Sequence, residues 1–387
     1  MPQRHIETRK TVFNSSAMLA HVSFRKKKGT GTMHREKQEV QKIEKMDENL
    51  GFPLPTGDPS VLPAGAKLER VFDAACFLTE GISVSPDDGM VYFCDITFTP
   101  LCKDPSGKYP GAGNIWKLDP KTRQATIFRS PSGMAAGTKF DAEGNLIIAE
   151  GNDFGGRRIS KIDMKTGKNY ILAGLYGGRP YNGPNDLTID ENGRIYFTDP
   201  RYFGYEAIEQ PVMGVYRIDP DGKVTRLITD AGKPNGICVS PDQKTLYVIA
   251  NDNGSLDQYR MEKGETSQRG LTALLAYALA PDGTVSNRRV LIDWFPNDGG
   301  DGMTVDVDGN LYVAVHEPDP ALFVYSPEGK VLATIPTGNA HSSNAYWPTN
   351  AAFGYGADGN LLYLTAGKLV YTVRMAKQGY HLKRRGR

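Results

Sequence analysis

The sequence predicts an all-β protein, a six-bladed β-propeller built from four-stranded blades. The chain of 387 residues contains 43 glycines and 25 prolines, which is typical of many turns rather than of long helices. Hydrophobic residues make up 39% of the chain, enough to form a large core. Above all, one pattern recurs at a spacing of roughly fifty residues, which is the length of a four-stranded propeller blade.

Six hairpins carry this repeat, each with an alternating apolar strand, a turn rich in Asp and Gly, and a second apolar strand. They read GISVSPDDGMVYFCD, GTKFDAEGNLIIAEG, DLTIDENGRIYFTD, GICVSPDQKTLYVIAND, GMTVDVDGNLYVAV and NAAFGYGADGNLLYLTAG. A weaker hairpin follows each of the first five, and the strand LVYTVRM ends the sixth unit. The Asp- and Gly-rich turns suit the φ > 0 positions of hairpins and lack the glutamate of an EF-hand loop, so we do not interpret them as calcium loops.

The sixth unit lacks a fourth strand, and the first apolar run of the body, KLERVF at residues 68–73, is expected to supply it. This closure pairs the two ends of the chain and leaves no open edge between the first and last blades. We therefore divide the chain into a basic extension without fixed structure over residues 1–60, the propeller over residues 61–380, and a basic tail over residues 381–387.

The charge distribution argues against nucleic-acid and membrane partners. The net charge is +2, but basic residues gather near the N-terminus and leave the body mildly acidic, so no basic face is expected. No apolar run approaches the ~20 residues of a membrane helix. The stretch TVFNSSAMLAHVSF is polar and ends in RKKK, unlike a signal peptide. We expect a cytoplasmic protein, or a periplasmic or secreted one if a misassigned start hides an export signal.

The four cysteines, Cys76, Cys94, Cys102 and Cys238, show no CxxC spacing, which argues against a thiolate zinc site. Pairing of Cys94 with Cys102 is one alternative in an oxidising compartment. The alternative that we favour is a set of unpaired, buried thiols.

The repeat also predicts where polar side chains meet. Aligned by their apolar alternation, the first strands place Ser85, Asp141, Asp190, Ser240, Asp306 and Gly354 at equivalent turns. Five residues earlier, at the start of each first strand, stand Glu80, Ala136, Asn185, Asn235, Asp301 and Thr349. First strands line the central channel of a propeller, so equivalent side chains converge on its axis. We expect these six ring positions to face one another at the mouth of the channel.

Four ring residues carry the oxygen ligands that hard cations prefer: Glu80, Asn185, Asn235 and Asp301. Two carboxylates and two amides without His or Cys favour Ca²⁺, with Mg²⁺ and Mn²⁺ as alternatives and Zn²⁺ less well suited. Because Ca²⁺ takes about 6–8 oxygens, four protein ligands leave room for water and for a substrate oxygen. The alternative interpretation is that these residues are ordinary strand-start caps.

Long loops with aromatic residues leave the second strands on the same face, for example RYFGYEAIEQPVMG at residues 201–214. Loops of this kind around a polar site are typical of small-molecule pockets. Tyr202, Phe203 and Tyr205 are candidates for stacking on a ring-shaped ligand, or for packing the loop alone.

Several of these segments resemble one known family. GGRPYNGPNDLTIDENGRIYFTDPRYFG, KPNGICVSPDQKTLYV, DGMTVDVDGNLYVA and PTNAAFG are similar to signatures of the SMP-30/gluconolactonase/LRE-like family, and the resemblance covers about residues 66–375. It implies a six-bladed propeller with one divalent metal, usually calcium, held by Glu80, Asn185, Asn235 and Asp301. It also implies hydrolysis of sugar lactones such as gluconolactone, with Asp301 as the candidate general base.

Other residues have candidate roles in that chemistry. Arg179 could bind sugar hydroxyls or the carboxylate product, or form a salt bridge within its loop. Asp199 is a candidate for orienting an inner ligand or binding a second cation. His316 could shuttle protons, or be an ordinary satisfied histidine. Ala136 departs from the polar residue that many relatives carry, which predicts a substrate preference shifted away from gluconolactone.

The leading interpretation is therefore a metal-dependent lactonase acting on a small-molecule lactone. Phosphotriester or other ester hydrolysis on the same scaffold is a second hypothesis. A metal-stabilised binding propeller without turnover is the third. The sequence leaves the lactone, the native metal and the oligomeric state undetermined.

Overall fold

A computed structural model describes residues 41–42, 53–99, 101–255, 269–338 and 347–385. Since none of residues 1–37 is among these, the fold is that of the unit from Gln38 to Arg387. Most of the predicted extension over residues 1–60, and the last two residues of the tail, lie outside the described residues. Within the described ranges no helix is long and apolar enough to cross a membrane.

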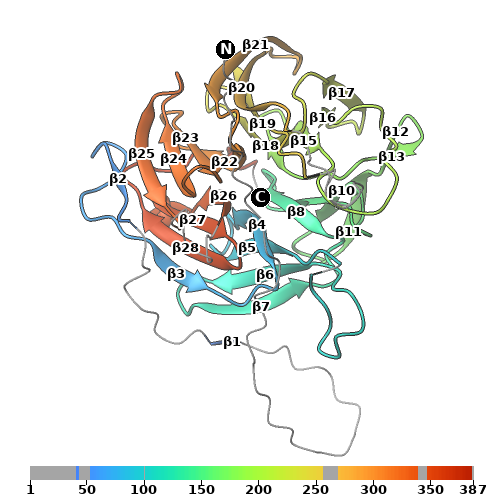
Figure 1. Ribbon diagram of the computed structural model, residues 1–387, viewed down its shortest axis with the longest axis horizontal. Coiled ribbons are helices and arrows are strands. Elements are labelled where there is room, and N and C mark those ends of the chain that lie inside the picture. Colours follow the sequence, from blue (N-terminus) through green and yellow to red (C-terminus); the bar gives the residue numbers. More distant parts are fainter. Residues whose placement is uncertain (1–40, 43–52, 100, 256–268, 339–346, 386–387) are drawn as a thin grey trace, which may run out of the picture. The chain divides into compact units, whose positions relative to one another are not determined.

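Six sheets of four or five strands surround a common axis, so the predicted six-bladed propeller is confirmed (Figure 1). Each blade is antiparallel, and its strands run in chain order from the hub to the rim, except that strands from the N-terminal part of the chain form the outer edge of three blades. The inner strands β4, β8, β14, β18, β22 and β26 contact one another in a closed ring. One 3₁₀ turn, η2 (Gly356–Asp358), is the only helical element in the described part of the chain.

The first three blades follow the predicted hairpins. Blade 1 contains β4 (Leu78–Val84), β5 (Val91–Ile96), β6 (Asn114–Asp119) and β7 (Gln124–Arg129), with β1 (Gln41–Lys42) at its outer edge. Blade 2 contains β8 (Ala135–Phe140), β9 (Leu146–Glu150), β10 (Arg158–Ile162) and β11 (Asn169–Ala173). A small hairpin of β12 (Leu175–Tyr176) and β13 (Arg179–Pro180) then leads to blade 3, which contains β14 (Leu187–Ile189), β15 (Ile195–Asp199), β16 (Gly214–Ile218) and β17 (Val224–Ile228).

The last three blades also follow the predicted hairpins. Blade 4 contains β18 (Pro234–Val239), β19 (Thr245–Asn251), β20 (Thr272–Leu279) and β21 (Val285–Asp293). Blade 5 contains β22 (Gly300–Val305), β23 (Leu311–Val315), β24 (Ala321–Tyr325) and β25 (Val331–Pro336), with β2 (Thr56–Gly57) paired to its outer strand. Blade 6 contains β26 (Pro348–Phe353), β27 (Leu361–Ala366), β28 (Leu369–Arg374) and β3 (Glu69–Phe72).

The pairing of β28 with β3 confirms the predicted closure of the ring. Val370 lies opposite Phe72 in this antiparallel pair, so a strand that precedes blade 1 completes blade 6. Phe72 is fully buried and packs against Phe93 of blade 1, with 4.8 Å between the ring centroids. The strand that closes the ring therefore also joins the cores of its first and last blades.

The C-terminal segment crosses the end of the hub where the first strands finish. The Tyr380 hydroxyl donates to Glu191 at 2.6 Å, Arg384 pairs with Asp87 at 2.7 Å, and His381 Nε2 lies 2.8 Å from the Gly354 carbonyl oxygen. These contacts reach blades 3, 1 and 6. A cavity of about 100 Å³ separates the segment from the inner strands. The channel mouth with the ring positions is at the opposite end.

A disulfide corrects the expectation for the cysteines. Cys76 is bonded to Cys102, whereas Cys94 and Cys238 are free and buried. Pairing of Cys94 with Cys102 is therefore wrong, because Cys94 lies inside β5 and its side chain belongs to the core. The bond ties the long loop after β5 to the segment that enters β4.

Replacing both bonded cysteines, Cys76→Ser with Cys102→Ser, is expected to lower the free energy of unfolding by about 2–4 kcal/mol, because the unfolded chain loses a cross-link. Guanidinium unfolding with and without reductant measures this. Reductant should shift the midpoint of the wild-type protein and leave the double variant unchanged. An unaltered wild-type midpoint under reduction would contradict a stabilising bond.

Candidate functional site

The ring positions predicted from the repeat are brought together by close contact between neighbouring first strands. Glycine follows the ring residue in four blades, as Gly81, Gly137, Gly236 and Gly302. A Cβ atom at Gly137 would lie 2.5 Å from the Asn185 carbonyl oxygen, and one at Gly81 would overlap the carbonyl of Ala136. Only a residue without a side chain allows this approach. At these four blades the backbone of one first strand therefore lies directly against the backbone of the next.

Carboxylates are concentrated at this mouth of the hub. Glu80 and Asp301 are buried, with 5% and 7% of their surfaces exposed. Burial raises the pKa of Glu80 well above its ordinary value, and the negative charges of Asp301 and Asp186 raise it further. These groups are near enough to repel one another electrostatically. In the described residues, no Lys, Arg or His side chain forms an ion pair with Glu80 or Asp186.

Asp186 and Asn350 form a polar connection between blades that the sequence analysis did not assign to the site. The Asn350 amide nitrogen donates to Asp186 Oδ2 at 3.4 Å and to Glu80 Oε2 at 3.3 Å. Both side chains are almost fully buried. Each occupies the position that glycine takes in the other four blades, and this exception to the glycine pattern was the available signal in the sequence.

The two predicted amide ligands differ in their surroundings. Asn235 is buried, and its side-chain nitrogen donates to the Tyr202 hydroxyl at 2.9 Å, which leaves its amide oxygen free to act as a ligand. Tyr202 in turn donates to the backbone carbonyl of Asn251 at 3.3 Å. Asn185 is partly exposed at the same mouth. Tyr202 thus orients a candidate metal ligand, a role different from the substrate contact predicted for it.

His316 lies between two acidic side chains beside the ring. Its Nε2 atom is 3.2 Å from Asp301 Oδ2, and its Nδ1 atom is 3.5 Å from Asp298 Oδ2. Burial lowers the pKa of His316, but the two carboxylates outweigh burial and raise the pKa to about 10. The imidazole also stacks on Trp347, with 5.4 Å between the ring centroids. These contacts fix His316 within the site, so it is not a solvated histidine.

Two predicted substrate-binding residues are not brought to the ring. Arg179 is exposed in the β12–β13 hairpin at the perimeter, where its guanidinium donates to the Glu209 carbonyl at 3.4 Å (Figure 1). Asp199 is fully buried and accepts hydrogen bonds from the backbone N–H groups of Asn182 and Gly183, at 2.9 and 2.7 Å. These contacts fix the segment leading to Asn185. Asp199 therefore acts through the backbone that leads to Asn185, because its carboxylate oxygens accept hydrogen bonds from backbone N–H groups.

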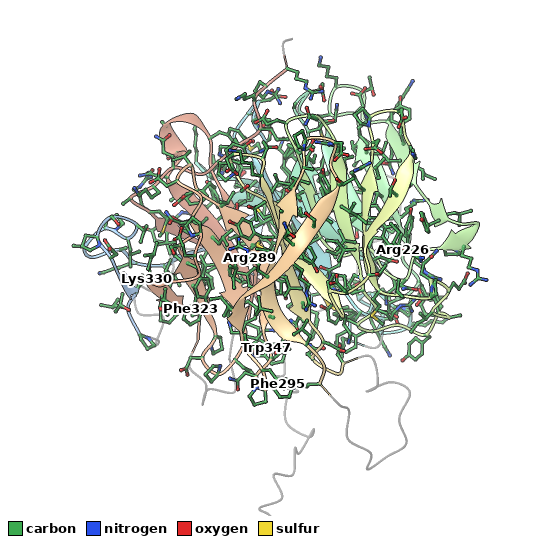
Figure 2. The ribbon with its side chains drawn as sticks, turned by 90° about the horizontal axis from the view of Figure 1, so that it is seen from above. Arg226, Arg289, Phe295, Phe323, Lys330 and Trp347 are labelled. Carbon is green, nitrogen blue, oxygen red and sulfur yellow. A yellow bond between two sulfur atoms is a disulfide. The ribbon has the colours of Figure 1, made fainter. Side chains whose placement is uncertain are left out.

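Aromatic residues surround the mouth, as expected from the loops. Phe203 packs edge-on against Phe98 of the blade 1 loop, with 4.8 Å between centroids, so it joins two loops. Tyr205 is exposed. Phe295 and Trp347 are also exposed, and Figure 2 shows them on the same face of the propeller. An apolar rim therefore borders the polar ring.

The residues present fit one hard divalent cation. In the described part of the chain, no three His, Cys, Asp or Glu side chains gather as a metal site, and the candidate set combines carboxylates with amides. Glu80, Asn185, Asn235 and Asp301 supply two carboxylates and two amides, the donors that Ca²⁺ prefers. Burial is the main cause of the raised pKa of Glu80, and repulsion from Asp301 and Asp186, which a cation would relieve, adds to it.

Fold and site together define a six-bladed propeller with oxygen ligands at one end of its hub. The sequence matches the SMP-30/Gluconolactonase/LRE-like region over residues 111–368, and the chain belongs to this family. It is 29% identical to a gluconolactonase of Zymomonas mobilis over 282 residues, which are 68% of this chain and 70% of that protein. It is 27% identical to the lactonase drp35 of Staphylococcus epidermidis over 288 residues, which are 69% of this chain and 79% of that protein.

A solved gluconolactonase structure from Xanthomonas campestris shares the fold. Its TM-score is 0.66 at 23% identity, and the match covers 84% of this chain and 96% of the other.

Asp186 makes the cation-free protein less stable as the pH rises. Burial raises the pKa of Asp186 to about 6. The folded state therefore holds this proton more tightly than the unfolded chain, so the associated stability is present below pH 3.8 and is lost as the pH rises through about 6. With chelator present, Asp186→Asn should gain about 2 kcal/mol relative to wild type between roughly pH 4.5 and 7.5. Urea unfolding at both pH values measures this, and a constant difference would contradict it.

Proposed function

We propose that the protein is a divalent-metal-dependent hydrolase that opens a small lactone to its hydroxy acid. The observation that supports the proposal is the group of buried polar side chains at the hub, in which Asn350 bridges Glu80 and Asp186 and the amide nitrogen of Asn235 donates to Tyr202. Membership of the SMP-30/Gluconolactonase/LRE-like family and the named activities of the two lactonase relatives support the same chemistry.

Glu80, Asn185, Asn235 and Asp301 would hold the cation, with Ca²⁺ as the preferred ion because all four donors are oxygens. When bound, a divalent cation supplies Lewis-acid polarisation of an ester carbonyl. Tyr202 keeps the amide of Asn235 turned so that its oxygen is available. Asn350 holds one oxygen of Glu80 and leaves the other free of described hydrogen bonds.

Asp301 is the proposed general base. Its Oδ2 atom contacts His316, and in the described residues no hydrogen bond occupies its Oδ1 atom. The carboxylate would take a proton from the water that attacks the lactone carbonyl carbon. The ring C–O bond then breaks, and the departing oxygen receives a proton to give the hydroxyl group of the product. One water is consumed, and no redox partner is required.

The surroundings bear on the choice of lactone. Ala136 offers only a methyl group at the second ring position, so it cannot hydrogen-bond a sugar hydroxyl there. Exposed aromatic residues at the rim add apolar surface. We propose gluconolactone-like substrates as the class, with a preference shifted toward less hydroxylated lactones. Phosphotriester hydrolysis has no observation of its own in its favour and remains an outcome of the assay.

Hydrolysis of glucono-δ-lactone, followed by the pH drop with Ca²⁺ or with EDTA, tests the proposal. Activity should require the cation, and Asp301→Asn should lower kcat/KM by about 10²–10⁴-fold, because a neutral amide cannot accept the proton. Cation binding without turnover of lactones, esters or phosphotriesters would instead support a non-catalytic binding propeller.

Asn235→Ala is expected to weaken Ca²⁺ binding and to make the melting temperature unresponsive to added Ca²⁺, because a ligand oxygen is lost. Calorimetric titration and thermal melts at several Ca²⁺ concentrations measure both effects. Asn192→Ala, at an exposed hairpin turn, is the matched control and should respond like wild type. A Ca²⁺-dependent rise in melting temperature that survives in Asn235→Ala would remove Asn235 from the ligand set.

A further inference from the structure

His316 joins two acidic residues of blade 5 that are separated in the sequence. Asp298 lies in the segment before β22, Asp301 is the ring residue within β22, and His316 directly follows β23. The imidazole nitrogens are 3.5 Å from Asp298 and 3.2 Å from Asp301. All three side chains are about nine-tenths buried. A buried charged triad of this kind is costly unless its members have a specific task.

The imidazole ring is held on several sides. The backbone N–H of His316 donates to the Gly299 carbonyl at 3.3 Å, which ties it to the segment between the two acids. Trp347, just before β26 of blade 6, stacks on the ring with an interplanar angle of 17°. Asp298 is itself anchored, because its backbone N–H donates to the Glu317 carboxylate at 2.9 Å. The ring therefore has little freedom to turn away from Asp301.

The contact with Asp301 is selective for one carboxylate oxygen. His316 Nε2 approaches Oδ2, and Oδ1 accepts no hydrogen bond from the described residues. At 3.2 Å, Nε2 is close enough to Oδ2 for an N–H group at this position to contact that oxygen, although the alignment is imperfect. A carboxylate held at one oxygen cannot rotate freely, and its other oxygen keeps a fixed direction. Partners of this kind orient metal-binding groups in proteins.

We propose that His316, supported by Asp298, is a positioning residue that fixes Asp301 through Oδ2 and reserves Oδ1 for the cation and the attacking water. This inference rests on the proposed function for the identity of the site. Trp347 sets the plane of the imidazole and Asp298 contacts its Nδ1 atom. The Nε2 atom then restrains the carboxylate of Asp301.

Three substitutions at one position separate positioning from packing. Gln places its amide nitrogen near the position of Nε2, whereas Asn places its own near that of Nδ1. His316→Gln should therefore keep the contact with Asp301, and His316→Asn and His316→Ala should lose it. We expect the Ca²⁺ dissociation constant to rise about 10–100-fold for His316→Ala and His316→Asn, and to stay within about threefold of wild type for His316→Gln. For Asp298→Asn we expect a Ca²⁺ dissociation constant between these limits.

Calorimetric titration of the full chain with Ca²⁺ measures these constants without reference to catalysis, and thermal melts in EDTA show whether each variant folds. His381→Gln is the matched control, since His381 is a partly buried histidine at the opposite end of the hub and should leave Ca²⁺ binding unchanged. Equal Ca²⁺ affinity in His316→Ala and wild type, with only a lower melting temperature, would overturn the inference, as would failure of Gln to retain affinity in a folded protein.

The same set distinguishes this inference from the proposed function. If wild type binds Ca²⁺ and the expected order of affinities holds but no lactone is hydrolysed, the proposed function fails and the positioning role stands. If lactones are hydrolysed and the affinities do not follow that order, the positioning role fails alone. Absence of any divalent-cation binding by the wild-type protein would overturn both.

Discussion

Like charges buried at the hub are the constraint on which the site depends. Glu80, Asp186 and Asp301 come from three blades and are buried close enough to one another to interact electrostatically. Such charges must be protonated, paired or neutralised by a cation. The structure uses two partial solutions: burial raises the pKa of Asp186, and Asn350 donates to both Glu80 and Asp186.

The rest of the propeller holds these groups at their short separations. Glycines after the ring residues let the strands approach, and the β28–β3 pair closes the ring so that the blades cannot spread. At the opposite end, the C-terminal segment ties blades 1, 3 and 6 together. Stability and function are therefore in tension at the hub, because the same packing that makes the fold rigid concentrates the repulsive charges.

The loops at the mouth fix the positions of side chains that the blades alone do not hold. The disulfide between Cys76 and Cys102 anchors the blade 1 loop four residues before Glu80. Phe98 of that loop contacts Phe203 of the blade 3 loop, so the two loops restrain each other's position. Tyr202, next to Phe203, orients Asn235. The aromatic loop residues and the candidate ligand Asn235 are in this way parts of one connected structure.

The sequence by itself determined the repeat, the number of blades and the closing strand, because hydrophobic alternation and turn chemistry are local and recur in every blade. The tertiary structure alone decided the direction of each side chain. Strand register shifts at the ring positions, for example between Pro348 and Asn350 and between Gly300 and Met303, so counting by twos cannot say which of two adjacent residues faces the axis. That is why Asn350 rather than Thr349 contacts Glu80, and why Asp199, Arg179 and the partner of Cys102 could not be placed from the sequence: each depends on a contact between segments distant along the chain.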